Sequence, residues 1–303
     1  MRDNEVIERI DAFCDAVPRH RARGEEHGPL VLFVPTGPGW PYYARPRQGA
    51  KPPITAADVR TVRARQRELI IPESFEWIEQ AAPDRAAAAA DGGLEVQTHP
   101  LLVLDEPVPQ PPLPPGITVR IIAPEDPELH RIWAVPSVAF GNPGTGIGEA
   151  GAAERDKIAA DHDGGTIEML RERLRSGQSV LAAAFGPDDH DSVYSPHGLG
   201  GPHGLGGPHG LSGPHGLSGP HGPIAAGSCQ AVGDIAEITG VGVLPSDRRK
   251  GLGAAVTAAL AIDALNRGIA TVFLSATDDA VARVYQRIGF RIIGTAMIAE
   301  PTP

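Results

Sequence analysis

The chain contains the stretch Ala236-Glu237-Ile238-Thr239-Gly240-Val241-Gly242-Val243-Leu244-Pro245-Ser246-Asp247-Arg248-Arg249-Lys250-Gly251-Leu252-Gly253. Its first part has the pattern of a strand that ends at the proline. A basic loop with two glycines follows, and the almost wholly apolar residues 254–265 then predict a buried helix. This order of strand, basic glycine loop and buried helix decides the expected fold.

The loop before the helix has the composition of an anion site. The first amides of a helix lack intrahelical partners, and the helix dipole is positive there, so a pyrophosphate can bind. Gly251 and Gly253 would let phosphates approach the backbone, while Arg248, Arg249 and Lys250 add positive charge. A basic helix N-terminus without a ligand is the alternative. Because cations there oppose the dipole, the pattern favours the anion site.

The segments after the loop complete a recognisable order. Asn266-Arg267-Gly268 closes the helix, residues 271–276 predict a strand, residues 280–288 a short helix and residues 290–298 a final strand. The chain here resembles the GCN5-related N-acetyltransferase (GNAT) superfamily. Arg248, Gly251 and Gly253 match its Arg/Gln-x-x-Gly-x-Gly/Ala signature, and Tyr285-Gln286-Arg287-Ile288-Gly289-Phe290 matches its Tyr-x-x-x-Gly-Phe motif.

The resemblance covers roughly residues 117–298 and implies an α/β fold. The expected core is a mixed, twisted sheet flanked by helices, in which the strand carrying residues 241–244 splays from the strand at 271–275. It also implies acetyl-CoA as co-substrate. The backbone groups of Val241 and Val243 would bind its pantetheine arm. The amides of the loop would bind its pyrophosphate, and this set comprises Arg249, Lys250, Gly251, Leu252, Gly253 and Ala254.

Two side chains are candidates for catalysis. A protonated amine must lose a proton before it attacks a thioester, so a nearby base helps. Glu237 stands where many GNAT enzymes keep a carboxylate, and Tyr285 would protonate the departing thiolate. The alternatives are a solvated strand residue for Glu237 and an aromatic packing residue for Tyr285. Cys229 has no histidine beside it in sequence, so we expect a buried, unreactive thiol.

The composition predicts two parts. The length of 303 residues suits two domains, and the proline-dense residues 105–116 predict a semi-rigid linker between residues 1–104 and 117–303. The first part is itself a mixed α/β region, smaller than the second. It is a degenerate GNAT-like half, a cover for the acceptor site or a surface for homodimer formation. This organisation resembles that of actinobacterial two-part acetyltransferases.

Residues 196–222 form a glycine-rich insertion. The unit Pro-His-Gly-Leu-Gly/Ser-Gly repeats every six residues and places five histidines in register from His197 to His221. Too little apolar area is present to offset the entropy of ordering, so we expect a disordered hairpin insertion. Metal binding by the imidazoles is the functional alternative. A second glycine pattern, Gly146-x-Gly148-x-x-Gly151, follows no clear strand, and we interpret it as a flexible loop flanking the acceptor site.

The charge and the remaining pattern limit the partners. A formal net charge of -10 argues against binding to nucleic acid or to an anionic membrane surface. The sequence has no apolar run long enough to span a membrane and no signal peptide, so we expect a cytoplasmic protein. The predicted function is transfer of an acetyl group from acetyl-CoA to a small-molecule or peptide amine. A non-catalytic acyl-CoA-binding module is the first alternative, and a metal-binding protein is the second.

Overall fold

The computed structural model of the chain describes residues 2–37, 42–49, 53–83, 85–106, 108–186 and 222–302. The helices in these residues are α1 (Asp3–Arg19), α2 (Ala56–Glu68), α3 (Arg85–Asp91), α4 (Leu129–Phe140), α5 (Ala152–Ala160), α6 (Gly164–Arg175), α7 (Leu252–Asn266) and α8 (Asp279–Gln286). The strands are β1 (Ala22–His27), β2 (Leu30–Pro35), β3 (Ala44–Pro46), β4 (Phe75–Ile78), β5 (Glu95–Leu104), β6 (Thr118–Ile121), β7 (Ser179–Phe185), β8 (Pro223–Val232), β9 (Ile235–Val243), β10 (Thr271–Ser275) and β11 (Phe290–Glu300).

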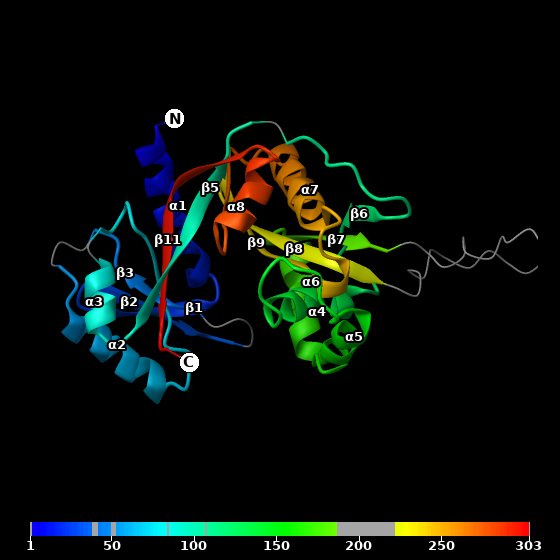
Figure 1. Cartoon of the computed structure of the whole chain (residues 1–303). Coiled ribbons are helices and arrows are strands. Elements are labelled where there is room, and N and C mark those ends of the chain that lie inside the picture. The colour runs from blue at the N-terminus through cyan, green and yellow to red at the C-terminus, as the bar shows by residue number, and fades with distance from the viewer. Residues whose placement is uncertain are drawn as a thin grey trace, which may run out of the picture.

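All the described strands belong to one sheet. Its order is β1-β2-β3-β4-β11-β5-β10-β9-β8-β7-β6. The long strands β5 and β11 lie in the middle of the molecule, with β1–β4 on one side and β6–β10 on the other (Figure 1). The predicted mixed, twisted sheet flanked by helices is confirmed, and it extends through the N-terminal part as well.

The two ends of the sheet repeat one topology. In each, three antiparallel strands precede a helix, a strand parallel to the third, a short helix and a last long strand. The N-terminal series is β1-β2-β3-α2-β4-α3-β5, and the C-terminal series is β7-β8-β9-α7-β10-α8-β11. The last strands are exchanged, because β11 pairs with β4 and β5 pairs with β10. Equivalent strands of the two series therefore lie at equal distances on either side of the β5–β11 pair.

Two hydrophobic clusters meet at this central pair, one on each face of β5. Leu102 of β5 is fully buried in the large cluster that includes α4, α6 and α7. Its neighbours Leu101 and Val103 point to the opposite face, where they pack with α1 residues such as Ile10. Since alternate residues of a strand face opposite sides of a sheet, a single strand contributes to two cores. β5 thus ties the N-terminal helix to the C-terminal half.

The elements predicted between residues 236 and 298 are present. β1, β3 and β4 were not predicted, because β1 is polar and the other two are too short to show alternation. α4 is continuous through Pro136. The predicted insertion at 196–222 lies outside the described residues except for Gly222. The strands on either side of it, β7 and β8, pair antiparallel.

The proposed boundary between residues 104 and 105 stays a prediction. It falls directly after β5, and β5 pairs with two strands of the C-terminal part. The sheet therefore crosses the boundary without a break.

We predict that the two halves unfold together. Replacing Leu102 by Ala should lower the free energy of unfolding by about 2–5 kcal/mol, because a fully buried leucine leaves a cavity. Urea unfolding can be followed by fluorescence in variants that keep only Trp77, in the N-terminal half, or only Trp133, in α4. We expect one common shift of the midpoint. Two separate urea midpoints for the two tryptophan variants, with only one of them moved, would contradict unfolding of the two halves as one unit. The control Ile121→Ala, at an exposed edge strand, should change stability by about 0.5 kcal/mol or less.

Candidate active site

The two parallel strands β9 and β10 separate at a defined position. They pair from Thr271↔Ile235 to Phe273↔Glu237, and the pairing ends there. The other edge of β10 pairs with β5, from Phe273 to Ser275. Among the described residues, no strand pairs with β9 from Ile238 to Val243 on the side of β10. This splay was expected from the GNAT resemblance, and the predicted pantetheine contacts, Val241 and Val243, lie in the separated part of β9.

The N-terminus of α7 lies at the outer end of the same strand. The N–H of Ala255, which donates to the Gly251 carbonyl, is the first amide of the helix with a backbone partner. Among the described residues, the amides of Leu252, Gly253 and Ala254 donate to no other backbone group. Gly251 has a φ of 76°, a left-handed conformation that costs other residues about 1–2 kcal/mol. These features fit the pyrophosphate of CoA.

The three cations of this loop have protein partners. The Arg248 guanidinium donates to the carbonyl oxygens of Ala139, Asn142 and Gly146 at 3.1, 2.5 and 3.2 Å. It thereby satisfies the C-terminal end of α4, where a cation is favourable. Arg249 Nε donates to the Thr145 carbonyl at 3.0 Å, and the loop holds Arg249 at a φ of 67°. The sequence argument was that three cations in this loop need a ligand. Contacts with backbone carbonyl groups are the alternative explanation for Arg248 and Arg249.

Lys250 and the second glycine pattern complete the surroundings of the loop. Lys250 Nζ lies 2.7 Å from Asp247 Oδ1, an exposed ion pair. The Gly148 amide donates to the Pro245 carbonyl, and the Ser246 amide donates to the Ala150 carbonyl, at 3.1 and 3.0 Å. The segment 146–151 thus packs on the loop that would hold the coenzyme.

Glu237 occupies the point where the splay begins. It is half-buried, and burial raises the pKa of its carboxyl to about 7. On one side it pairs with Phe273, and on the other with Gln230, whose amide oxygen accepts from Arg173 of α6 at 3.0 Å. A carboxyl group with this pKa is partly deprotonated at neutral pH, which suits a general base.

Residues of the N-terminal half approach the same face of the sheet. The ring of Phe13 on α1 packs edge-on against Phe273 with centroids 5.1 Å apart. Tyr43 Oη donates to the Cys14 carbonyl at 3.0 Å, and the buried Arg45 binds both the carbonyl and the carboxylate of Asp11. α1 therefore bridges β3 to the strand beside Glu237.

We call Cys14, Tyr43, Arg45, Glu76 and Glu237 the seam cluster, because it joins the two halves. Burial and the nearby charge of Glu237 raise the pKa of Glu76 to about 8, while Arg45 acts in the opposite direction. Burial followed by the charge of Glu237 also raises the pKa of Cys14. Four of these residues come from the N-terminal half. No sequence motif identified these four residues, and Glu76 lies on a strand that the sequence did not predict.

Tyr285 lies on the opposite face of the sheet from Glu237. Its ring is buried beside Phe290, with centroids 6.3 Å apart, in the core cluster that includes α7. Burial raises its pKa to about 12, so the phenol is protonated at neutral pH and can donate a proton. Cys229 is also buried, and burial raises its pKa to about 12. Such a thiol is a poor nucleophile.

Metal binding and membrane insertion are two further features that the sequence raised. The described part of the chain contains no group of three or more His, Cys, Asp or Glu that could hold a metal ion. The histidine repeat lies outside that part, so metal binding by the repeat stays a prediction. None of the helices described is both long and apolar enough to cross a membrane.

Comparisons with known proteins agree with this geometry. Residues 222–298 match the model of a family described as FR47-like protein. The chain is similar in structure to a GCN5-related N-acetyltransferase from Kribbella flavida, with a TM-score of 0.64 and 21% identity over 98% of this chain and 96% of that one. A tandem GNAT protein from the clavulanic acid biosynthesis pathway matches with a TM-score of 0.48 and 17% identity, over 90% and 79% of the two chains. No curated protein matches the sequence.

The predicted resemblance to the GNAT superfamily is therefore confirmed. The whole chain has the fold of a GCN5-related N-acetyltransferase, and the FR47-like match covers β8 to most of β11. The matched segment includes both motifs from which the resemblance was predicted.

Arg248 is predicted to have a structural role. Replacing it by Ala should lower the free energy of unfolding by about 1–3 kcal/mol without any ligand, because three carbonyl groups lose a charged donor. Thermal or urea unfolding measures the change. The control Lys250→Ala removes only an exposed ion pair and should cost about 0.5 kcal/mol or less. Equal stability of the Arg248 variant and the wild type would contradict the structural role.

The raised pKa of Glu76 predicts a pH dependence of stability. A carboxyl group whose pKa is higher in the folded state favours folding when protonated. Its contribution is present below about pH 4.5 and is lost as the pH rises towards about 8. Stability of Glu76→Gln should therefore fall less than that of the wild type between these pH values, as measured by urea midpoints. The exposed control Glu8→Gln should keep the wild-type slope, and a wild-type slope in Glu76→Gln would exclude the effect.

Proposed function

We propose that the protein is an acetyl-CoA-dependent N-acetyltransferase that acts on a primary amine by direct attack. The observation that carries the proposal is the position of Glu237. It lies where β9 and β10 separate, and the unpartnered amides of α7 lie at the other end of the opened strand. A thioester held along this edge would present its carbonyl carbon near the carboxylate.

The donor would bind through the backbone. The amides at the start of α7 and the left-handed Gly251 accommodate the pyrophosphate, and the open edge at Val241 and Val243 accommodates the pantetheine arm. The fixed loop geometry, held by Arg248 and Arg249 on the segment after α4, would preorganise these amides. Side-chain charge then contributes a favourable field rather than direct contacts.

The acceptor would approach from the face covered by α1. Glu237 removes a proton from the ammonium group, and the amine nitrogen attacks the thioester carbonyl carbon. The new C–N bond forms as the C–S bond breaks, and Tyr285 gives its proton to the thiolate. The amide nitrogen then releases its second proton to water, and Tyr285 takes a proton back from water. The seam cluster surrounds the acceptor side of Glu237, which gives the N-terminal half the role of covering the acceptor. This accounts for the carboxyl of Glu76 close to the reacting centre.

The catalytic role of Glu237 predicts a specific kinetic change. Glu237→Gln should lower kcat/KM by about 100-fold or more, because a general base typically contributes a factor of 10²–10⁴. The wild-type kcat/KM should rise with pH up to about 7 and then level off, as Glu237 loses its proton. Thiol release from acetyl-CoA with a panel of primary amines measures both. Calorimetry should show unchanged affinity for CoA.

A control variant and an outcome that would contradict the proposal complete this test. Glu106→Gln, on an exposed carboxylate after β5, should keep wild-type kinetics. Tight CoA binding without thiol release for any amine would refute the enzyme and support a non-catalytic acyl-CoA-binding module. Tyr285→Phe should lower kcat while leaving CoA affinity unchanged.

A further inference from the structure

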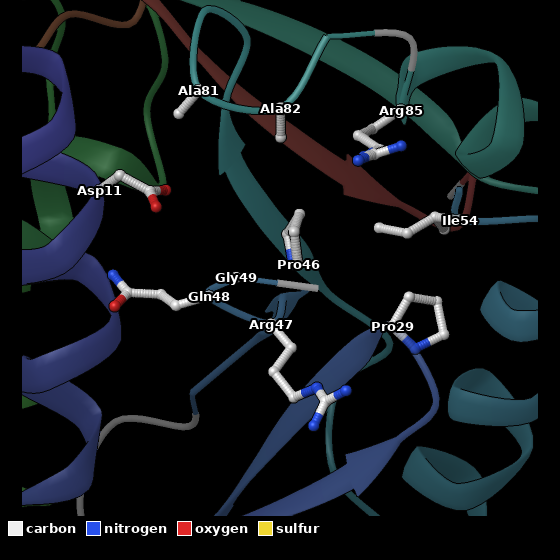
Figure 2. Close-up of a pocket in the computed structure, with 10 residues that line it drawn as sticks. All are labelled: Asp11, Pro29, Pro46, Arg47, Gln48, Gly49, Ile54, Ala81, Ala82 and Arg85. Carbon is white, nitrogen blue, oxygen red and sulfur yellow. The ribbon is translucent and has the colours of Figure 1, made fainter. Parts of the chain in front are cut away.

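The N-terminal half contains a pocket that the proposed reaction does not use. It is lined by residues from α1, the segments that follow β3 and β4, and the starts of α2 and α3 (Figure 2), which include Asp11, Arg47, Gln48, Ile54, Ala82 and Arg85. Figure 2 shows Asp11 pointing towards the space from α1, with Arg85 and Ile54 pointing towards it from the other side. The pocket is thus built from elements distant in sequence.

Its place in the topology matches that of the proposed donor site. β3 and β4 are parallel and pair only at Ala44↔Phe75. The pocket lies just beyond this pairing, between the residues after β3 and the residues after β4. In the C-terminal half, the corresponding position lies beyond Phe273↔Glu237, where the donor would bind. The repeated topology therefore opens a second space between parallel strands.

The pocket has hydrogen-bond donors without acceptors. In the described part of the chain, Arg85 has no hydrogen bond or ion pair, and its Nε is buried without a partner. Arg47 Nη1 binds Glu26 at 2.8 Å, but its Nε is buried and also has no partner. A buried donor without a hydrogen-bond partner destabilises the folded state. A ligand oxygen that accepted from these groups would remove that destabilisation.

The other lining residues restrict the chemistry of the ligand. Asp11 already binds Arg45 through its carboxylate, so it does not neutralise the unpaired arginine. Its negative charge disfavours a multiply charged anion such as phosphate. Pro29, Pro46, Ile54 and the two alanines supply an apolar wall.

We infer that this pocket binds a small organic monocarboxylate, with its carboxylate on Arg85 and its apolar body against Ile54 and Ala82. An arginine fork matches a carboxylate in a bidentate manner. The ligand differs from CoA, and its binding does not depend on acetyl transfer. The N-terminal half then combines two roles, since it covers the proposed acceptor face and carries a separate ligand site.

Butyrate is a suitable probe for the full-length protein. We expect a dissociation constant of about 1 mM or tighter by calorimetry, together with an increase in Tm that grows with butyrate concentration. Three further compounds define what the pocket recognises. Butanol tests whether binding needs the negative charge, inorganic phosphate tests which type of anion binds, and CoA tests whether a nucleotide binds. Arg85→Met should weaken butyrate binding by about tenfold or more, because it removes the fork but keeps the aliphatic stem. The control Arg60→Met removes an exposed arginine of α2 and should leave butyrate affinity unchanged.

A second measurement locates the ligand without relying on a variant that has to fold. In wild-type protein with labelled isoleucine methyl groups, butyrate should give nuclear Overhauser contacts to Ile54. Those contacts, together with the loss in Arg85→Met, would support the site. Equal affinity of Arg85→Met and wild type, contacts only to other isoleucines, or tighter binding of phosphate than of butyrate would each overturn it.

Discussion

The pairing of β5 with β11 is the interaction on which the rest of the structure depends. These two strands come from opposite halves of the chain and lie antiparallel along ten residue positions, from Phe290↔Leu104 to Glu300↔Glu95. Each completes the sheet of the other half, because β11 pairs with β4 and β5 pairs with β10. Neither half can bury its last helices without a strand that the other half supplies. The exchange also fixes α1 over the face that carries Glu237.

The site follows from a limit in this same sheet. β10 pairs with β9 for only three residues, from Thr271↔Ile235 to Phe273↔Glu237, while its other edge pairs with β5. β10 therefore lies between the strand that the N-terminal half inserts and the strand that carries Glu237. Glu237 occupies the last position that β9 and β10 share, so the general base proposed for the reaction lies where the two parallel strands separate. Its raised pKa then reflects burial under residues from both halves.

The charges around the proposed donor and acceptor sites serve different purposes. Arg248 and Arg249 bind carbonyl groups of α4 and of the segment after it, so they hold the loop at the start of α7. In the seam cluster, by contrast, Glu76 and Glu237 share a buried region in which Arg45 is already paired with Asp11. The N-terminal half therefore supplies a second carboxyl group whose pKa is raised by the charge of Glu237.

The sequence by itself determined the local order from β9 to β11 and predicted an anion site in the loop before α7. These depend on short-range features: alternation in β9, glycines at 251 and 253, an apolar α7 and the Tyr285 to Phe290 motif. The elements of the N-terminal half were harder to predict from the sequence, because β3 and β4 have only three and four residues. Only the tertiary structure decided the exchange of β5 and β11, the partners of Arg248 and the surroundings of Glu237. Each of these joins residues more than 100 positions apart, and local pattern carries no information about which distant strand or carbonyl will be the neighbour.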